Sequence, residues 1–234
     1  MAFTPEHTAA DIVKVFPKAS DFFKEHRIDY CCGGDRPLRQ SFIEQNLNET
    51  ALLSSLNQAY ATWKEEDHDI TDWDKVSLTQ LVDHITETYH SYIGDELVPL
   101  GQFVTKIYRV HGSHHPHLKE LHRLYHEFKT EMEEHTIQED QVVFHLIKQY
   151  DQNPSEELLE QIREANGGLE DEHSYVGNLL KQIRDLTEDF TLPDGACNSY
   201  RITYARLEEL ESNTFQHIHL ENNILFKRLT EHDQ

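Results

Sequence analysis

The stretch HTIQEDQVVF, residues 135–144, decides the fold that we predict for this chain. Steps of four and three residues in both directions from His135 and Glu139 trace one core-facing stripe of a helix. The stripe consists of Leu121, Tyr125, Phe128, Met132, His135, Glu139, Val142 and Leu146. An imidazole and a carboxylate are therefore expected within an otherwise apolar helix face.

A second stripe near the C-terminus repeats this pair. It consists of Leu210, Thr214, His217, Glu221 and Ile224, and again places a histidine and a glutamate four residues apart. Burying both groups in an apolar seam costs on the order of several kcal/mol unless something compensates them. One such pair could hydrogen-bond internally or face a wet groove, but the repetition on two helices favours a bound metal.

The composition favours an all-α protein and excludes some partners. Only 9 of the 234 residues are glycine and 7 are proline, which is typical of helical proteins. The 43 acidic and 21 basic residues give a formal net charge of −22. Such a surface repels nucleic acid and anionic membranes, so we expect no nucleic acid and no membrane as partner.

The chain shows no sign of export. Its N-terminus lacks the pattern of a signal peptide, and no apolar run has membrane-spanning length. The three cysteines, two of them adjacent, do not make a disulfide framework. We therefore expect a soluble, cytoplasmic protein.

Residues 1–64 are expected to form a small helical domain. Helical spacing over residues 9–28 is interrupted at Pro17, the pair Gly33 and Gly34 predicts a loop, and Asn48 is expected to cap the next helix. Residues 65–76 are polar, acidic and without periodicity, and we interpret them as a linker.

Residues 77–234 are expected to form an up-down-up-down four-helix bundle. The first helix starts at a capping box of Ser77 and Gln80, and the second spans about 117–150. The third carries a stripe that includes His173, and the fourth runs from about Ser199 nearly to the C-terminus.

Inward stripes at matching heights of a bundle would bring six polar side chains together. They are His84, His135, Glu139, His173, His217 and Glu221. Four imidazoles and two carboxylates suit two cations, because each glutamate has two oxygens and can bridge them. Structural zinc closes at four ligands and often uses thiolates, and none of these stripes contains cysteine. Iron is therefore favoured over zinc, whereas manganese would accept the same ligands.

The sequence resembles the hemerythrin-like fold, and more closely the di-iron proteins of the RIC (repair of iron centres) family. The resemblance spans almost the whole chain and is carried by the following segments: IDYCCGG at 28–34, LVDHITETYH at 81–90, HTIQEDQVVF, EDEH at 170–173 and HIHLENNILF at 217–226. It implies two non-haem, carboxylate-bridged iron ions, with an oxo bridge as an option. It further implies His84 and His217 on one iron, His135 and His173 on the other, and Glu139 and Glu221 bridging.

Two local features refine this expectation. Oxygen-carrying hemerythrins usually have a second histidine one turn after the third-helix histidine, whereas this chain has Gly177 there. Fewer imidazoles favour reaction or iron release over reversible oxygen carriage. Cys31 and Cys32 precede two glycines, and the resemblance implies that they act by capturing iron or a cluster as thiolates; from spacing alone they could also be one buried and one incidental thiol.

Other polar residues have weaker interpretations. Glu131 and Glu172 could line a polar route to the metals or belong to a solvated face. Cys197 is expected to pack in a turn. The histidines near the first interhelical turn are expected at the surface; they are His111, His114, His115, His117, His122 and His126.

Three functions follow from these expectations. The first, implied by the resemblance, is repair of iron–sulfur clusters damaged by oxidative or nitrosative stress, with damaged iron–sulfur proteins as partners and iron handed over through Cys31 or Cys32. The second is reduction of nitric oxide at the irons. The third is a sensor or store for oxygen or iron. The sequence leaves open whether the protein forms a homodimer.

Overall fold

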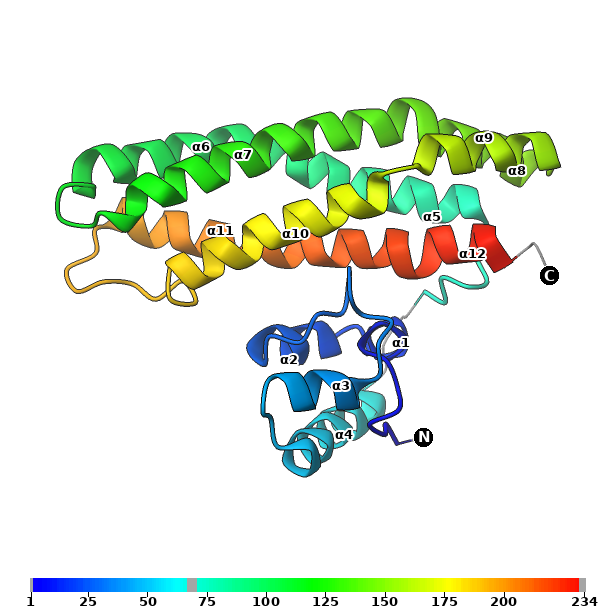
Figure 1. Cartoon of the computed structure of the whole chain (residues 1–234), viewed down its shortest axis with the longest axis horizontal. Helices are drawn as coiled ribbons and strands as arrows, with labels where there is room; N and C mark the ends of the chain where they lie inside the picture. Colours follow the sequence, from blue (N-terminus) through cyan, green and yellow to red (C-terminus); the bar gives the residue numbers. More distant parts are fainter. Residues whose placement is uncertain (1, 67–70, 232–234) are drawn as a thin grey trace. The chain divides into compact units, whose positions relative to one another are not determined.

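The computed structural model describes residues 2–66 and 71–231, and helices dominate these residues (Figure 1). Within them there is no strand, and the only strand-like pairing is one isolated bridge between Thr8 and Pro37. The prediction of an all-α protein is confirmed. None of the described helices is both long and apolar enough to cross a membrane.

The chain divides into two compact units. One consists of Met1–Val76 with Ile218–Gln234, and the other of Ser77–His217. The boundary at 217/218 falls inside one uninterrupted helix, because α11 (Asn198–Leu220) continues through the π-helix η3 (Glu221–Leu225) into α12 (Phe226–Glu231). The last helix therefore contributes residues to both units.

The N-terminal part of the first unit contains four helices: α1 (Ala9–Val15), α2 (Ala19–Glu25), α3 (Leu38–Glu44) and α4 (Glu49–Glu65). Pro17 separates α1 from α2, and the Asn48 side chain accepts a hydrogen bond from the Ala51 amide, as predicted. Aromatic rings fill much of the small core; Phe16 lies 5.0 Å from Trp63 between ring centroids. Of the predicted linker 65–76, residues 67–70 lie outside the described residues.

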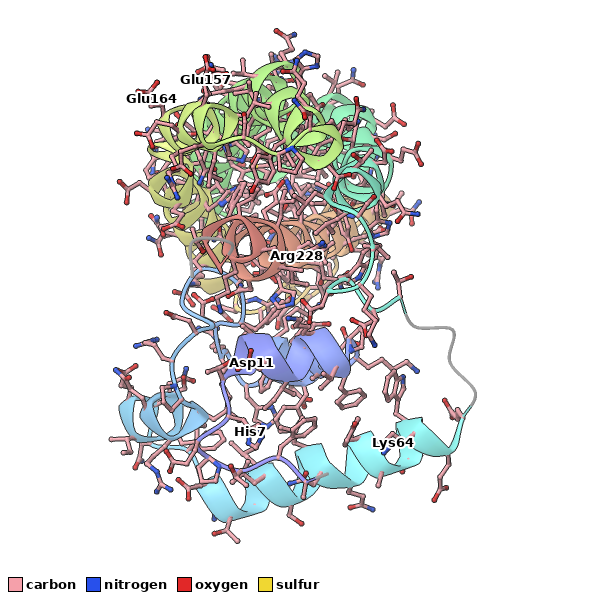
Figure 2. All side chains as sticks on the ribbon, turned by 90° about the vertical axis from the view of Figure 1, so that its right-hand side faces the viewer. His7, Asp11, Lys64, Glu157, Glu164 and Arg228 are labelled. Atoms are coloured by element: carbon pink, nitrogen blue, oxygen red, sulfur yellow. The ribbon has the colours of Figure 1, made fainter. Side chains whose placement is uncertain are left out.

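The C-terminal segment of the first unit is tied to residues before the bundle. Arg228, labelled in Figure 2, donates to the carbonyl oxygens of Trp73 and Val76, both at 2.8 Å. A guanidinium presents several donors in a fixed fork, so one side chain satisfies two carbonyls. This contact fixes the chain just before the first bundle helix begins.

The second unit is a bundle of long helices that lie side by side (Figure 1). Its elements are α5 (Leu78–Ile85), η1 (Thr86–His90), α6 (Ser91–His111), α7 (His117–Gln138), η2 (Glu139–Val143), α8 (Phe144–Gln152), α9 (Glu156–Asn166), α10 (Leu169–Leu186) and the first part of α11. Because η1 and η2 join their neighbours without a break, the first two long helices span 78–111 and 117–152. The predicted bundle is thus confirmed. On α9, Glu157 and Glu164 point into solvent (Figure 2).

π-Helical turns interrupt the long helices, and the buried face of the second one shifts at its turn η2. A π-turn accommodates one more residue than an α-turn, so the apolar stripe moves by one position beyond it. In the second long helix the predicted stripe residue Val142 is 46% exposed, whereas Val143 and Ile147 are fully buried. The predicted placement of Val142 and Leu146 in the core is therefore wrong. The stripe is correct up to Glu139, where η2 begins.

The capping box at the start of the bundle is present as predicted. The Ser77 hydroxyl accepts from the Gln80 amide, and the Gln80 side chain accepts from the Ser77 amide, both at 3.1 Å. We expect Ser77→Ala to lower the free energy of unfolding by about 1 kcal/mol, a typical cost of losing an N-cap, measured by urea denaturation. Asn178→Ala, at an exposed mid-helix position, should not destabilise. Equal stability of Ser77→Ala and the parent would contradict this role.

Candidate metal centre

Among the described residues there are two overlapping groups of buried donors. The first is His90, Glu139, His217 and Glu221, and the second is His135, Glu139, His173 and Glu221. Within each group the ligand atoms lie within 4.8 Å of one another. Five of the six predicted ligands are thereby brought together; His84 is not among them.

The five donors within the second unit are closely spaced. His90 Nε2 lies 3.0 Å from His217 Nε2, and His135 Nε2 lies 2.9 Å from His173 Nε2. Glu139 lies between these two histidine pairs: its Oε2 is 3.4 Å from His90 Nε2 and 3.1 Å from His135 Nε2. One carboxylate therefore reaches both pairs, as a bridging ligand must.

Glu221 completes both groups. It follows His217 by four residues in the uninterrupted helix formed by α11 and η3, so local helix geometry carries both side chains on one face. Glu139 and Glu221 each begin a π-helix, and His90 ends one. π-Turns inside α-helices often occur at functional sites. Here each of the three turns places a candidate ligand.

The structure does not bring the predicted first-helix ligand, His84, to the donor groups and places His90 there instead. His84 is half-buried, its Nδ1 lies 3.3 Å from Thr88 Oγ1, and it belongs to neither donor group. Because the π-turn η1 intervenes, the inward position after Ile85 is five residues later, at His90. His90 is 6% exposed. The sequence did contain a signal for it, since His90 precedes the apolar residues Ile93 and Leu97, both buried, by three and seven residues.

Partly exposed carboxylates orient two of the histidines. His90 Nδ1 donates to Asp140 Oδ1 at 2.9 Å, and His135 Nδ1 donates to Glu172 Oε2 at 2.9 Å. A carboxylate on the outer nitrogen fixes the tautomer and makes the inner nitrogen a better ligand. In both histidines Nε2 thus faces the cluster as an acceptor. The sequence periodicity did not indicate Asp140, because its position next to Glu139 lies off the stripe.

The donor set fits two metal ions. Glu139, His173, His217 and Glu221 are fully buried, and burying four imidazoles and two carboxylates at such short separations is costly without a cation between them. Nitrogen and carboxylate oxygen donors without sulfur suit iron or manganese. Aromatic walls enclose the donors: Phe144 stacks on His90 at 5.3 Å, and Tyr89 lies parallel to His217 at 6.1 Å.

The two adjacent cysteines lie in a tight loop of the first unit. Asp29 Oδ1 accepts from the amides of Cys31 and Gly33 at 3.0 and 3.2 Å. A Cβ on Gly34 would meet the Tyr30 carbonyl oxygen at 2.3 Å, so the loop requires glycine there. Cys31 is buried, Cys32 is partly exposed, and their sulfurs lie 3.7 Å apart.

This loop is held by residues on either side of Glu221. His219 Nδ1 donates to the Tyr30 carbonyl at 3.1 Å, and Asn223 Nδ2 donates to the Cys31 carbonyl at 2.8 Å. Burial lowers the pKa of His219 to about 4, so its imidazole is neutral near pH 7. The cysteine loop and Glu221 therefore share one helical segment as their support.

The remaining candidates lie outside the donor groups. Cys197 is exposed with its sulfur 3.2 Å from His111 Nε2, so the prediction that it packs is wrong. His117 Nε2 contacts the hydroxyls of Tyr200 and Tyr204, both at 3.1 Å. Glu131 is half-buried and belongs to neither group. Gly177 is buried in α10, so that helix supplies His173 alone.

Comparison with known proteins places both parts of the chain. Residues 81–229 match the hemerythrin HHE cation binding domain, and residues 5–60 match a domain of unknown function, DUF542. The chain is 33% identical over 228 residues to the iron–sulfur cluster repair protein ScdA of Staphylococcus epidermidis, which covers 97% of this chain and 99% of that protein. It is 32% identical over 212 residues to the iron–sulfur cluster repair protein YtfE of Yersinia pseudotuberculosis, which covers 91% of each. The chain thus belongs to the family of iron–sulfur cluster repair proteins with a hemerythrin HHE cation binding domain.

Proposed function

We propose that this protein holds two iron ions and supplies iron to iron–sulfur proteins whose clusters have been damaged by oxidative or nitrosative stress. The observation that carries this proposal is the pair of buried donor groups sharing Glu139 and Glu221. The similarity to ScdA and YtfE, both named iron–sulfur cluster repair proteins, supports it. The sulfurs of Cys31 and Cys32 lie 3.7 Å apart, too far for a disulfide bond between them, which fits the reducing cytoplasm, where we propose that the protein acts.

Each side chain of the centre has a distinct task. His90 and His217 would hold one ion, His135 and His173 the other, and Glu139 and Glu221 would bridge both. Bound iron would supply Lewis-acid and redox chemistry. Asp140 and Glu172 keep Nε2 of His90 and of His135 directed into the cluster.

The same two outer carboxylates offer a route for iron as cargo. The side chains of Asp140 and Glu172 are 38% and 44% exposed, and each contacts a buried histidine of the cluster. A hard cation entering or leaving would exchange water for carboxylate oxygen before it meets imidazole. The net charge of −22 attracts cations toward this route. Glu172 is one of the two carboxylates, with Glu131, that the sequence offers for such a route.

Cys31 and Cys32 are proposed to hand the iron over. Thiolates bind iron well, and Cys32 is partly exposed. The support of their loop by His219 and Asn223 links it to the segment that carries Glu221. We accordingly propose that residues 1–64 deliver iron and residues 77–234 store it, with 65–76 as the connection, although 218–234 group with the N-terminal residues.

The double variant Cys31→Ser/Cys32→Ser tests delivery separately from storage. We expect it to bind two iron ions like the parent, because neither cysteine belongs to a donor group. The rate at which the variant repairs a cluster protein damaged by nitric oxide should fall to the rate with free ferrous iron. The rate is measured from the return of the cluster's absorption. Cys197→Ser, which removes an exposed thiol elsewhere, is the matched control. Parent protein that repairs no faster than free iron would refute iron donation itself.

Nitric oxide or oxygen as a direct ligand is the second candidate. Each donor group offers four protein ligands, fewer than the six of octahedral coordination, and Gly177 adds none. Rapid mixing of the ferrous protein with nitric oxide distinguishes the two functions. Stoichiometric nitrous oxide would support nitric oxide reduction, whereas its absence would leave iron donation as the function.

A further inference from the structure

A cationic groove between α6 and α7 lies within the second unit, apart from the metal centre. It has a volume of about 510 Å³ and is lined by Val98, Gly101, Gln102, Thr105, Lys106, Arg109, Val110, His126 and Lys129. A volume of this size suits a small organic ligand. None of the lining residues is acidic, although acidic residues outnumber basic ones two to one in the chain.

Two of the three lining cations lack a carboxylate partner. Lys129 pairs with Glu133 at 2.5 Å. Lys106 and Arg109 are exposed and form no ion pair with any residue in 2–66 or 71–231. In a chain with a net charge of −22, cations left without an acidic neighbour in a concave site create a local positive potential that favours an anion.

Nearby cations help to lower the pKa values of two histidines of α7, His126 in the groove lining and its neighbour His122. Burial lowers the pKa of His122, and the positive charge of Arg109 lowers it further. Burial likewise lowers the pKa of His126, with added effects of His122 and Lys129. Both rings contact Thr105 Oγ1, at 3.2 and 3.4 Å. The imidazole of His126, the hydroxyl of Thr105 and the two cations Lys106 and Arg109 therefore bring several hydrogen-bond donors to the groove.

The rest of the groove is apolar. Val98 and Val110 are 51% and 62% exposed, so they offer apolar surface to a ligand rather than to the core. At Gly101 a Cβ would come within 3.2 Å of the buried Tyr125 ring, so the lack of a side chain lets α6 and α7 pack closely beneath the groove. A ligand with one apolar end and one charged end would match both halves.

We propose that this groove binds a small organic anion, with a phosphate or carboxylate head on Lys106 and Arg109 and an apolar body against Val98 and Val110. Arginine presents a planar fork of donors to such a head, and lysine adds a point charge. Carboxylates and phosphate monoesters share this chemistry. The site is independent of the proposed iron donation.

Titration calorimetry of the iron-loaded full chain with phenyl phosphate, inorganic phosphate and phenol tests the proposal. Phenyl phosphate should bind at one site. Inorganic phosphate, which lacks the apolar body, and phenol, which lacks the charge, should each bind at least about tenfold more weakly. The absorption of the iron centre should stay unchanged during the titration, which separates this site from binding at the metals.

The double variant Lys106→Ala/Arg109→Ala should weaken phenyl phosphate binding by at least about tenfold, because both charge-assisted contacts are lost. Lys119→Ala/Arg201→Ala removes two exposed cations outside the groove, changes the net charge equally, and should bind like the parent. The proposal is wrong if phenyl phosphate does not bind, if phenol or phosphate binds as tightly, or if both variants lose binding alike. It is also wrong if, of phenyl phosphate and a glutamate-rich peptide, only the peptide binds the parent and loses binding in Lys106→Ala/Arg109→Ala. The groove would then be a protein docking surface.

Discussion

Glu139→Gln is expected to remove both metal ions from the chain. Glu139 belongs to both donor groups, and its carboxylate lies 3.1 Å from His135 and 3.4 Å from His90. Glutamine has nearly the same volume but no charge, and its amide nitrogen cannot act as a ligand. The iron content after reconstitution and desalting should fall from two per chain to nearly zero, measured by elemental analysis.

Two further variants calibrate this result. Glu131→Gln removes a half-buried carboxylate about two turns before Glu139 on the same helix, outside both groups, and should retain two iron ions. His135→Leu removes a ligand of one group only and should retain about one. If Glu139→Gln kept one iron, the carboxylate would serve a single ion and the bridging assignment would be wrong.

The same variant separates metal binding from folding. A bound metal stabilises the native state by about 2.7 kcal/mol when its free concentration is 100 times the dissociation constant. Ferrous iron should therefore raise the melting temperature of the parent and leave that of Glu139→Gln unchanged. Without iron, the variant should be at least as stable as the parent, because a buried amide costs less desolvation than a buried carboxylate.

Helical periodicity predicted most of the fold and of the centre. The inward positions of His135 and Glu139 follow from their spacing to Met132 and Phe128, which are fully buried as predicted. The starts of two helices could also be predicted, because the N-cap hydrogen bonds of Ser77 and Asn48 are local and do not depend on the rest of the chain. These features depend on residues near one another in sequence.

Periodicity failed where the helix geometry changes. A stripe drawn with steps of three and four assumes α-helical turns throughout, and a π-turn breaks that assumption without any proline or glycine to mark it. The periodicity therefore predicts Val142 in the core, whereas Val143 is the residue buried there. Hydrogen bonds between helices, such as that from His135 to Glu172, were beyond the reach of single-helix patterns because they depend on how two helices pack.

The comparison of His90→Leu with His84→Leu tests directly whether His90, rather than His84, is the ligand on the first long helix. His90→Leu should reduce the iron content from two to about one per chain, because His90 and His217 form one pair of donors and His217 alone would remain. His84→Leu should retain two. Both variants replace a histidine on the first long helix by the same side chain, six residues apart, so they differ mainly in the direction in which the side chain points.

A spectroscopic readout makes the comparison sharper than metal content alone. Coupling between two bridged irons disappears when only one ion remains, so magnetic measurements on the ferric form should show an isolated iron in His90→Leu and a coupled pair in His84→Leu. Asp140→Asn, which disturbs the outer hydrogen bond of His90 and a contact with the Thr86 hydroxyl, should weaken iron binding by about 10- to 100-fold without changing the stoichiometry at saturation. A coupled pair in His90→Leu together with its loss in His84→Leu would return the ligand to position 84 and show that the π-turn at 86–90 does not set the register of the first helix.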